Sequence, residues 1–378
     1  MSKARRINFN VLLISAESWS GHWVSKHHYA KALVDAGISV YFLEPPTLGS
    51  KKFTVQEAKD VLGVHVLSCR RVFPALQYIP GIFRRLIERR WLNSLERFLD
   101  INFDVVWLFE NSRFFDMRFA AHRLKIYHQV DLNQNFHPLT AAKTADIVLC
   151  TSDVIANNLA KSGKKIHKIH HGVTLHQGNP QTLSESSKIK NSDINAAYVG
   201  NLDIDYLDLP LLEEAVSMHP EIVFHLVGGY CSEGETYSAL KKYQNVRWWG
   251  QVNPAAVASI LHTIDISLLI YKAETYRDQL SSPHKVMEYL AAGAVCVATY
   301  TDEYKDRPEL LQMAERREDY LLLLAEVVKS LEVYNSPDAV KCRQAFAGSH
   351  TYSKQLQRIV AIIENAGFKM PILRARDE

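Results

Sequence analysis

Cysteine is scarce in this sequence, and its distribution excludes two classes of small, cross-linked protein. There are five cysteines among 378 residues. An odd number of widely separated cysteines forms neither a disulfide framework nor a zinc cluster, so we expect free thiols in a reducing cytoplasm. The five are Cys69, Cys150, Cys231, Cys296 and Cys342.

Long apolar runs are also absent. No stretch approaches the roughly 18 uncharged apolar residues of a membrane-spanning helix. Residues 1–6 lead into a strand pattern without the apolar core of a signal peptide. We therefore expect a cytoplasmic protein. The formal net charge of +3 gives no reason to expect nucleic acid as a partner.

The length and the pattern of apolar residues predict two domains of the α/β class. A chain of 378 residues exceeds what one hydrophobic core usually supports. Continuous apolar runs alternate with helix-like periodicity, which is typical of parallel sheets covered by helices on both faces. The predicted fold class is therefore α/β, with two doubly wound, Rossmann-like domains. A polar segment without apolar periodicity, at 178–191, separates them.

The predicted boundaries follow from this pattern. The domains are residues 1–178 and 192–349, joined by a linker at 179–191 and followed by a terminal helical segment at 350–378. The predicted strands are 9–15, 38–43, 104–109, 125–129, 146–151, 165–170, 196–199, 222–227, 246–249, 264–270 and 294–299. The predicted helices are 24–36, 84–99, 153–161, 209–218 and 352–366.

Residues 281–299, SSPHKVMEYLAAGAVCVAT, carry the most specific pattern in the chain. Ser282 is a suitable N-cap, and Pro283 suits the first position of a helix. Gly293 predicts a left-handed helix end, followed by a buried strand. Lys285 and Glu288 are three residues apart and should lie side by side. A lysine in the first turn of a helix attracts phosphate, and a carboxylate one turn further can bind a ribose diol.

This segment resembles the donor-binding helix of GT-B glycosyltransferases of the bacterial surface-polysaccharide type, with a group 1-like donor domain. The family pattern is close to S-P-x-K-x-x-E-Y-L-A-x-G-x-x-V-V-A-T. The resemblance implies two Rossmann-like domains facing each other across a cleft, with the last helix crossing back to the first domain. It implies that Glu288 holds the donor ribose, and that Ser282, His284 and Lys285 face the diphosphate. The alternative is an amphipathic helix with a surface Lys–Glu pair.

Two more segments of the second half resemble strand–loop units of the same donor domain, at 197–202 and 224–229. Gly200 and Gly228 end these strands, where a missing side chain lets backbone approach a phosphate. Tyr271 ends a later strand and is a candidate to pack on a base or sugar. The structural alternatives are ordinary turns for the two glycines and a buried aromatic for Tyr271.

In the first half, two places are candidates for acceptor-side chemistry. An inverting transfer needs a base to take the proton of the acceptor hydroxyl. Asp131 follows a predicted strand and resembles the strand-end aspartate of related enzymes, so it is the first candidate base. His22 is the second, on a loop whose Gly21 and Trp23 are candidate acceptor-side residues. Either polar side chain is alternatively a loop cap.

The chain departs from the family pattern at two places. Retaining enzymes often have a second glutamate eight residues before the ribose-binding one, and that position is Leu280 here. The Arg and Lys that often follow the glycine loop are also missing, which favours inversion. Asp203 and Asp205 spell a D-x-D metal motif, but such short motifs arise by chance, so we expect no metal and no cofactor beyond the nucleotide-sugar substrate.

Arginines interleave with apolar residues between 73 and 92, near further basic residues at 51–52 and 70–71. This mixture suits a helix on an anionic bilayer, and it extends the expected location to the inner face of the membrane. The alternative is a core helix with a solvated arginine face.

The combined expectation is a hexosyltransferase that uses a nucleotide diphosphate sugar, with UDP favoured, and a saccharide or lipid-linked acceptor. The setting would be bacterial O-antigen, capsule or lipopolysaccharide synthesis. Rivals are an epimerase of the same fold and a catalytically silent sugar-binding protein. A dinucleotide oxidoreductase is disfavoured, because no G-x-G-x-x-G follows the first strand.

Overall fold

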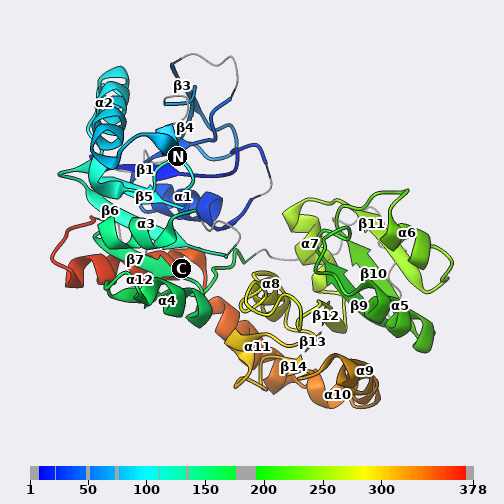
Figure 1. Ribbon diagram of the computed structural model, residues 1–378. Helices are drawn as coiled ribbons and strands as arrows, with labels where there is room; N and C mark the ends of the chain where they lie inside the picture. The colour runs from blue at the N-terminus through cyan, green and yellow to red at the C-terminus, as the bar shows by residue number, and fades with distance from the viewer. Residues whose placement is uncertain are drawn as a thin grey trace. The chain divides into compact units, whose positions relative to one another are not determined.

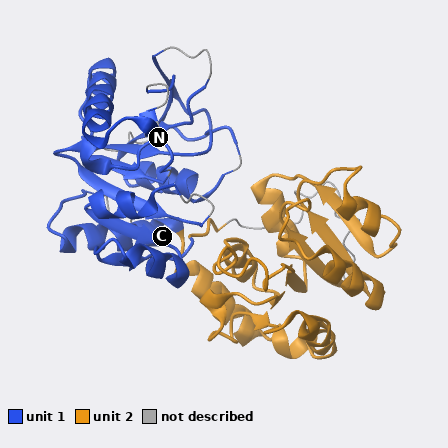
Figure 2. Ribbon diagram, viewed as in Figure 1, with its two compact units in different colours: residues 1–171, 352–378 blue, residues 172–351 orange. Residues whose placement is uncertain are grey.

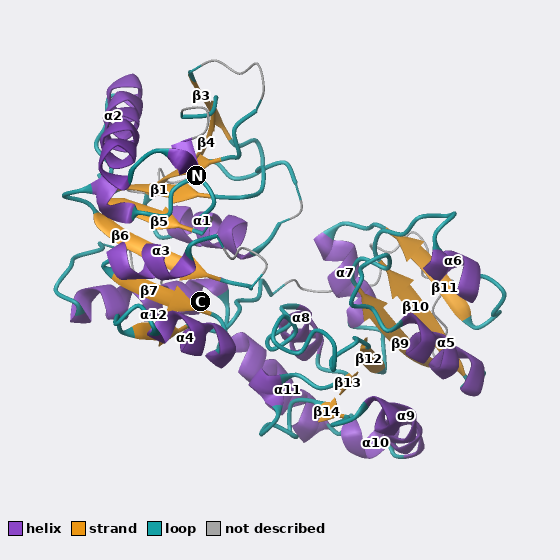
Figure 3. Cartoon of the chain, viewed as in Figure 1, coloured by secondary structure: helices purple, strands orange, loops and turns teal. Residues whose placement is uncertain are grey.

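A computed structural model describes residues 8–21, 23–47, 52–72, 76–109, 111–132, 136–175 and 193–371. The chain divides into two compact units, residues 1–171 with 352–378 and residues 172–351 (Figure 2). Each unit is a sheet of mostly parallel strands with helices on both faces (Figures 1 and 3). The predicted α/β class with two parallel-sheet domains is confirmed. The predicted linker at 179–191 lies outside the described residues.

In the described part of the first unit, the strand order is β3-β4-β2-β1-β5-β6-β7-β8, with β3 antiparallel to β4 and the other pairs parallel. The strands are β1 (Asn10–Ile14), β2 (Ser39–Leu43), β3 (Phe53–Glu57), β4 (Val64–Cys69), β5 (Val105–Leu108), β6 (Leu124–Gln129), β7 (Ile147–Cys150) and β8 (Ile166–Lys168). The helices are α1 (Ser25–Asp35), α2 (Gly81–Leu99), α3 (Pro138–Thr144), α4 (Asp153–Ala160) and α12 (Tyr352–Asn365).

In the described part of the second unit, six parallel strands follow the order β11-β10-β9-β12-β13-β14. They are β9 (Ile194–Val199), β10 (Ile222–Val227), β11 (Val246–Gly250), β12 (Ile266–Leu269), β13 (Val295–Ala298) and β14 (Gln312–Met313). The helices are α5 (Leu209–Met218), α6 (Glu235–Leu240), α7 (Pro254–Leu261), α8 (Lys285–Ala292), α9 (Tyr320–Lys329), α10 (Leu331–Tyr334) and α11 (Pro337–Gly348).

Alternate residues of the first unit's strands build two separate cores. Val11 and Leu13 of β1 face α1 and α12, while Leu12 and Ile14 face the second half of α2. The helix α12 packs on α1, where the Tyr352 ring stacks on His28 at 4.5 Å between centroids. Residues 352–365 thus contribute to the core of the first unit, although they follow the second unit in sequence.

The predicted strands are present within two residues of their predicted bounds, but β3, β4 and β14 were not predicted. The edge strand β3 exposes Val55, Gln56 and Glu57, so it lacks the continuous apolar run of a central strand. None of the described helices combines the length and the hydropathy needed to span a bilayer.

The first half of α2 buries charge in place of apolar side chains. Arg84 and Glu88 are buried, with the Arg84 Nε 3.5 Å from a Glu88 carboxylate oxygen. Burial raises the pKa of Glu88 from 4.5 to about 8, against the opposing effect of Arg84. Between these two values the folded protein holds a proton that the unfolded chain has lost. The free energy of unfolding therefore falls as pH rises through this window.

We expect Glu88→Gln to remove this decline, since an amide carries no charge to desolvate. At pH 8 the variant should exceed the wild type in free energy of unfolding by on the order of 1–3 kcal/mol. Chemical denaturation at several pH values between 4.5 and 8 measures the difference. Glu96→Gln on the same helix is the control. It disrupts the paired hydrogen bonds of Glu96 with Arg123 and should lower stability instead. If the free energies of unfolding of Glu88→Gln and the wild type changed in parallel with pH, a raised pKa of Glu88 would be contradicted.

Candidate functional site

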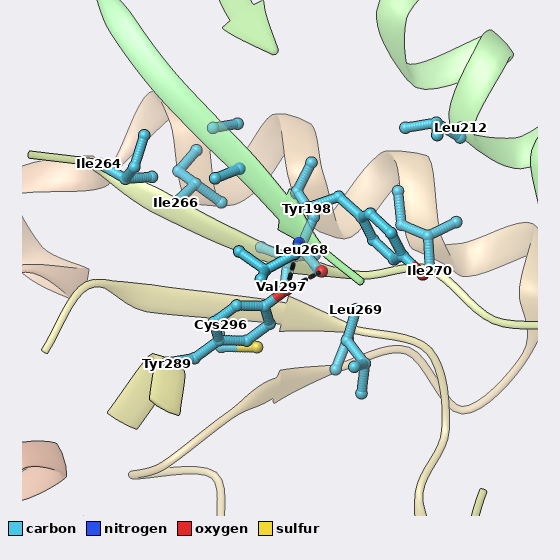
Figure 4. Close-up of a cluster of buried hydrophobic side chains, with 14 of the residues drawn as sticks. Tyr198, Leu212, Ile264, Ile266, Leu268, Leu269, Ile270, Tyr289, Cys296 and Val297 are labelled. Atoms are coloured by element: carbon cyan, nitrogen blue, oxygen red, sulfur yellow. Dashed lines mark hydrogen bonds between the residues drawn. The ribbon is translucent and has the colours of Figure 1, made fainter. Parts of the chain in front are cut away.

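A buried tyrosine hydroxyl lies where the strand order of the second unit reverses. The strands β9 and β12 pair at Ala196–Ile266 and Ala197–Ser267. Further along, the Tyr289 hydroxyl accepts a hydrogen bond from the Val199 amide at 2.9 Å and donates one to the Leu268 carbonyl at 3.2 Å (Figure 4). Burial raises the pKa of this phenol, so it stays neutral and able to donate. In doubly wound sheets, ligands bind at this reversal point, beyond the carboxyl ends of the strands.

Tyr289 belongs to α8, the helix of the predicted donor motif. Its Val286, Met287 and Leu290 are buried, and Gly293 ends it in the left-handed conformation with φ of 98°. The predicted start is wrong. The helix begins at Lys285, and the N-cap is His284, with helical φ of −63° and no side-chain cap.

The reason for the later start is a tertiary contact of the residue before Ser282. The Ser281 carbonyl accepts hydrogen bonds from the Thr301 hydroxyl at 2.9 Å and the Glu303 amide at 3.0 Å. The chain at 281–282 is therefore bound to the segment after β13. Val286 and Met287 amides then donate to carbonyls three residues back, at 3.2 Å each, which closes a tight first turn.

Lys285 and Glu288 lie side by side on the open face of α8. The ammonium nitrogen is 3.1 and 3.2 Å from the two carboxylate oxygens, and the side chains are 22% and 36% exposed. An ion pair with this exposure is worth about 0–1 kcal/mol. A diphosphate could therefore draw Lys285 away from Glu288 at little cost, leaving the carboxylate free for a diol.

The two predicted glycines, Gly200 and Gly228, lie where the loops after β9 and β10 contact each other closely. The Gly200 amide donates to the Val227 carbonyl at 2.9 Å. Gly228 has φ of 145°, and a Cβ there would lie 1.8 Å from the Gly200 carbonyl oxygen. A Cβ on Gly200 would meet the Tyr198 hydroxyl at 2.9 Å. Glycine at 228 is thus required by the close approach of the Gly200 loop, independently of any phosphate.

Tyr271 is buried at the end of the strand region and faces other aromatic rings. Its ring meets Tyr206 edge-on at 5.1 Å and Tyr198 at 6.2 Å between centroids. Its amide donates to the Thr299 hydroxyl at 3.1 Å. At 7% exposure the residue offers a ligand little surface, so the packing alternative accounts for it directly.

Both aspartates of the D-x-D segment make hydrogen bonds to neighbouring loops. The Asp203 carboxylate accepts a hydrogen bond from the Cys231 amide, and the Asp205 carbonyl accepts one from the Lys272 ammonium at 2.8 Å. Among the described residues, no three His, Cys, Asp or Glu side chains are arranged to hold a metal ion.

The predicted acceptor-side residues belong to the first unit. Asp131 follows β6 and is half-buried, and its carbonyl accepts a hydrogen bond from Gln129 Nε2 at 3.1 Å. Gly21 closes a turn onto the Ser18 carbonyl at 3.1 Å. The Trp23 ring packs edge-on against Trp19, 5.2 Å away between centroids. His22 lies outside the described residues.

Sequence reasoning missed a buried lysine beside these residues. Lys26 of α1 is 1% exposed, and its ammonium pairs with the Glu17 carboxylate, which is 38% exposed. Burial, together with charges on His171 and Lys26, lowers the pKa of His128 to about 3. The burial of Lys26 could have been predicted from its spacing. Lys26, Ala30 and Leu33 lie on one face of α1, and that face is otherwise apolar and buried. Glu17 is thus a partly exposed carboxylate held in place just after β1.

Comparisons with known proteins found similar sequences and similar folds. The family model described as glycosyl transferases group 1 matches residues 195–332. A curated relative, the putative teichuronic acid biosynthesis glycosyltransferase TuaH of Bacillus subtilis (strain 168), is 29% identical over 168 residues. The alignment covers 43% of this chain and 42% of the relative, so the chain spans less than half the length of that relative.

Solved structures resemble the chain over nearly its whole length. Sucrose-phosphate synthase from Thermosynechococcus elongatus has a TM-score of 0.70 at 14% identity, covering 95% of this chain and 100% of that one. Anabaena HepE, in complex with UDP and glucose, has a TM-score of 0.68 at 12% identity, covering 94% and 100%. Likeness at such low identity bears on the fold alone.

Tyr289→Phe should cost about 1–3 kcal/mol in the free energy of unfolding, because the Val199 amide loses its acceptor inside the core. Tyr320→Phe is a matched control. That hydroxyl is equally buried, but it makes a hydrogen bond only to a carbonyl, Val297, at 3.2 Å, so its removal leaves no amide without an acceptor. Urea denaturation compares the two variants. If both variants lost the same free energy of unfolding, the two hydrogen bonds by which Tyr289 joins β9 and β12 would contribute no more to stability than the single hydrogen bond of Tyr320.

Proposed function

Because the chain has the GT-B fold and residues 195–332 carry a group 1 glycosyltransferase domain, we propose that the protein is a glycosyltransferase. It moves a hexosyl unit from a nucleotide diphosphate sugar to a saccharide acceptor. The observation that carries the proposal is the partly exposed Lys285–Glu288 pair on α8. Glu288 directly precedes Tyr289, whose hydroxyl binds the Val199 amide at the end of β9.

In this proposal, α8 holds the donor. Glu288 accepts hydrogen bonds from the ribose hydroxyls, and Lys285 with the start of its helix binds the diphosphate. Ser282 and His284 lie before that start, and the backbone at Gly200 and Gly228 borders the phosphates. Tyr271 would support the site from within the core. UDP is the favoured nucleotide, and a neighbour in fold has been solved with UDP and glucose.

The proposed chemistry is a single inverting displacement. The acceptor oxygen attacks the anomeric carbon, its proton passes to the Asp131 carboxylate, and the bond to the diphosphate breaks with the electron pair leaving on phosphate oxygen. His22 is the second candidate base, with Gly21 and Trp23 beside it on the acceptor side. Leu280, 5% exposed, stands where a retaining enzyme often has a second glutamate. Lys285 stabilises the leaving diphosphate, so the proposed reaction needs no metal.

The proposed setting is synthesis of a bacterial surface polysaccharide such as O-antigen, capsule or lipopolysaccharide, at the inner face of the cytoplasmic membrane. The supporting observation is the relative, whose name assigns it to teichuronic acid biosynthesis. A lipid-linked saccharide would be the acceptor in that setting.

Removing either member of the α8 pair should weaken nucleotide binding in distinguishable ways. Glu288→Ala should raise the Kd of both uridine and UDP by about 10- to 100-fold, the effect of losing hydrogen bonds to a charged group. Lys285→Ala should raise the Kd of UDP but leave that of uridine unchanged. Isothermal titration measures both constants, and GDP, CMP and dTDP in parallel identify the base.

The control is Asp319→Ala, which breaks another i,i+3 ion pair of the same unit, with Arg316. Its nucleotide affinity should equal that of the wild type. If the α8 variants bind all nucleotides as this control does, the pair has only a structural role and the proposed donor site is wrong.

Asp131→Asn should separate binding from chemistry. The amide cannot take a proton, so the rate of sugar transfer should fall by about 10²- to 10⁴-fold while UDP affinity is unchanged. The assay follows nucleotide diphosphate release with and without acceptor. An unaltered rate would shift the role of base away from Asp131, with His22→Asn the next variant. In the wild type, donor conversion without acceptor would indicate an epimerase, and no release would indicate a sugar-binding protein.

A further inference from the structure

The first half of α2 exposes the side chains that an amphipathic helix normally buries. Ile82 and Phe83 are 66% and 62% exposed, Leu86 is 45% exposed, and Tyr78 just before the helix is 80% exposed. Ile82, Phe83 and Leu86 lie within four positions on one side of α2, and these three side chains are here called the α2 apolar patch. In Figure 1, α2 is the cyan helix at the edge of the first unit.

The opposite face of the same turns is polar and buried. Arg84 and Glu88 point into the unit, with Arg84 Nη2 3.6 Å from an Asp116 carboxylate oxygen. The Arg84 guanidinium also stacks on the Phe115 ring, 3.8 Å from its centroid. Both Glu88 oxygens lack a hydrogen-bond partner.

These contacts fix the rotation of the helix, so the apolar patch is held outward at an energetic cost. Burying charge is expensive, and an exposed apolar cluster is unusual for a soluble surface. The second half of the helix is ordinary by comparison, since it buries Trp91, Leu92 and Leu95. The arrangement with apolar side chains outside and polar side chains inside is confined to residues 81–90. We take this as a sign that the patch has a partner.

The charges around the patch define that partner. The acidic residues of α2, Glu88 and Glu96, are both buried. Arg89, Arg90 and Arg97 are exposed, so the helix presents cations and apolar groups to solvent but no carboxylate. This combination matches an anionic lipid surface, where apolar side chains enter the acyl boundary and arginines contact the headgroups.

We propose that the α2 apolar patch docks the first unit on an anionic bilayer. Ile82, Phe83 and Leu86 enter the interface, and Arg89 and Arg90 bind lipid phosphates. The inference deepens the proposed function, which it rests on for its role, because a lipid-linked acceptor lies at such a surface. Its test needs neither donor nor acceptor, so the two can fail separately.

The experiment is co-sedimentation of the full chain with vesicles. Wild-type protein should bind phosphatidylglycerol–phosphatidylcholine vesicles at least tenfold more tightly than pure phosphatidylcholine vesicles, and added salt should weaken the binding. The triple variant Ile82→Ser, Phe83→Ser, Leu86→Ser should lose at least tenfold in affinity. The double variant Arg89→Gln, Arg90→Gln should lose preference for the anionic vesicles.

The matched control is Leu322→Ser with Val333→Ser, which removes two apolar side chains of the second unit that are more exposed than those of the patch. It should bind vesicles as the wild type does, and thermal unfolding should show all variants folded. Glu288→Ala should also bind vesicles normally, so loss of donor binding cannot mimic loss of docking.

Three results would overturn the proposal. The triple variant could bind as tightly as the wild type, or the wild type could bind neutral and anionic vesicles equally. In the third case, the wild type would ignore vesicles and self-associate in light scattering, while the triple variant would be monomeric. The α2 apolar patch would then be an interface between two copies of the chain.

Discussion

The Tyr289 hydroxyl is the contact on which the geometry of the proposed donor site depends. In a doubly wound sheet the two central strands lead to helices on opposite faces, so their carboxyl ends diverge. Here β9 and β12 pair at two residues each, and the phenol then binds the Val199 amide and the Leu268 carbonyl. Because Glu288 precedes Tyr289 in the same turn, the bond that joins the strands also fixes the carboxylate beside their opening. The sheet's central contact and the proposed donor site thus depend on adjacent residues, Tyr289 and Glu288.

Much of this could be predicted because central parallel strands are apolar throughout, a pattern that local sequence records. The structure departs from prediction where tertiary contacts override local preference. Ser282 has the chemistry of an N-cap, but the Ser281 carbonyl is bound to Thr301 and Glu303, and the helix starts later. The strand β3 was missed because an edge strand needs no second apolar face. Gly228 was predicted as a site residue, and the structure adds that it admits the Gly200 carbonyl, a contact between loops 28 positions apart that no local pattern encodes.

The first unit buries charge at two separate places, and each determines what lies on the surface nearby. Lys26, under the loop after β1, holds the Glu17 carboxylate in a fixed and partly open position. Arg84 and Glu88, under α2, hold apolar side chains outward. Neither arrangement favours stability, since replacing buried charges by packed apolar groups is often stabilising. In each place the buried charges instead determine which groups stay on the surface: a carboxylate on the loop after β1, and apolar and cationic side chains on α2.

The position of α12 has a consequence for how the protein is made. Leu356, Ile359, Val360 and Ile363 fill one core of the first unit, but the ribosome synthesises them only after the whole second unit. Domains generally fold as units during synthesis. The second unit can therefore fold while the first still lacks a helix over one face of its sheet. That face, with Val11 and Leu13, stays open to non-native association until residues 352–365 emerge, which makes it the part of the nascent chain where a chaperone would act.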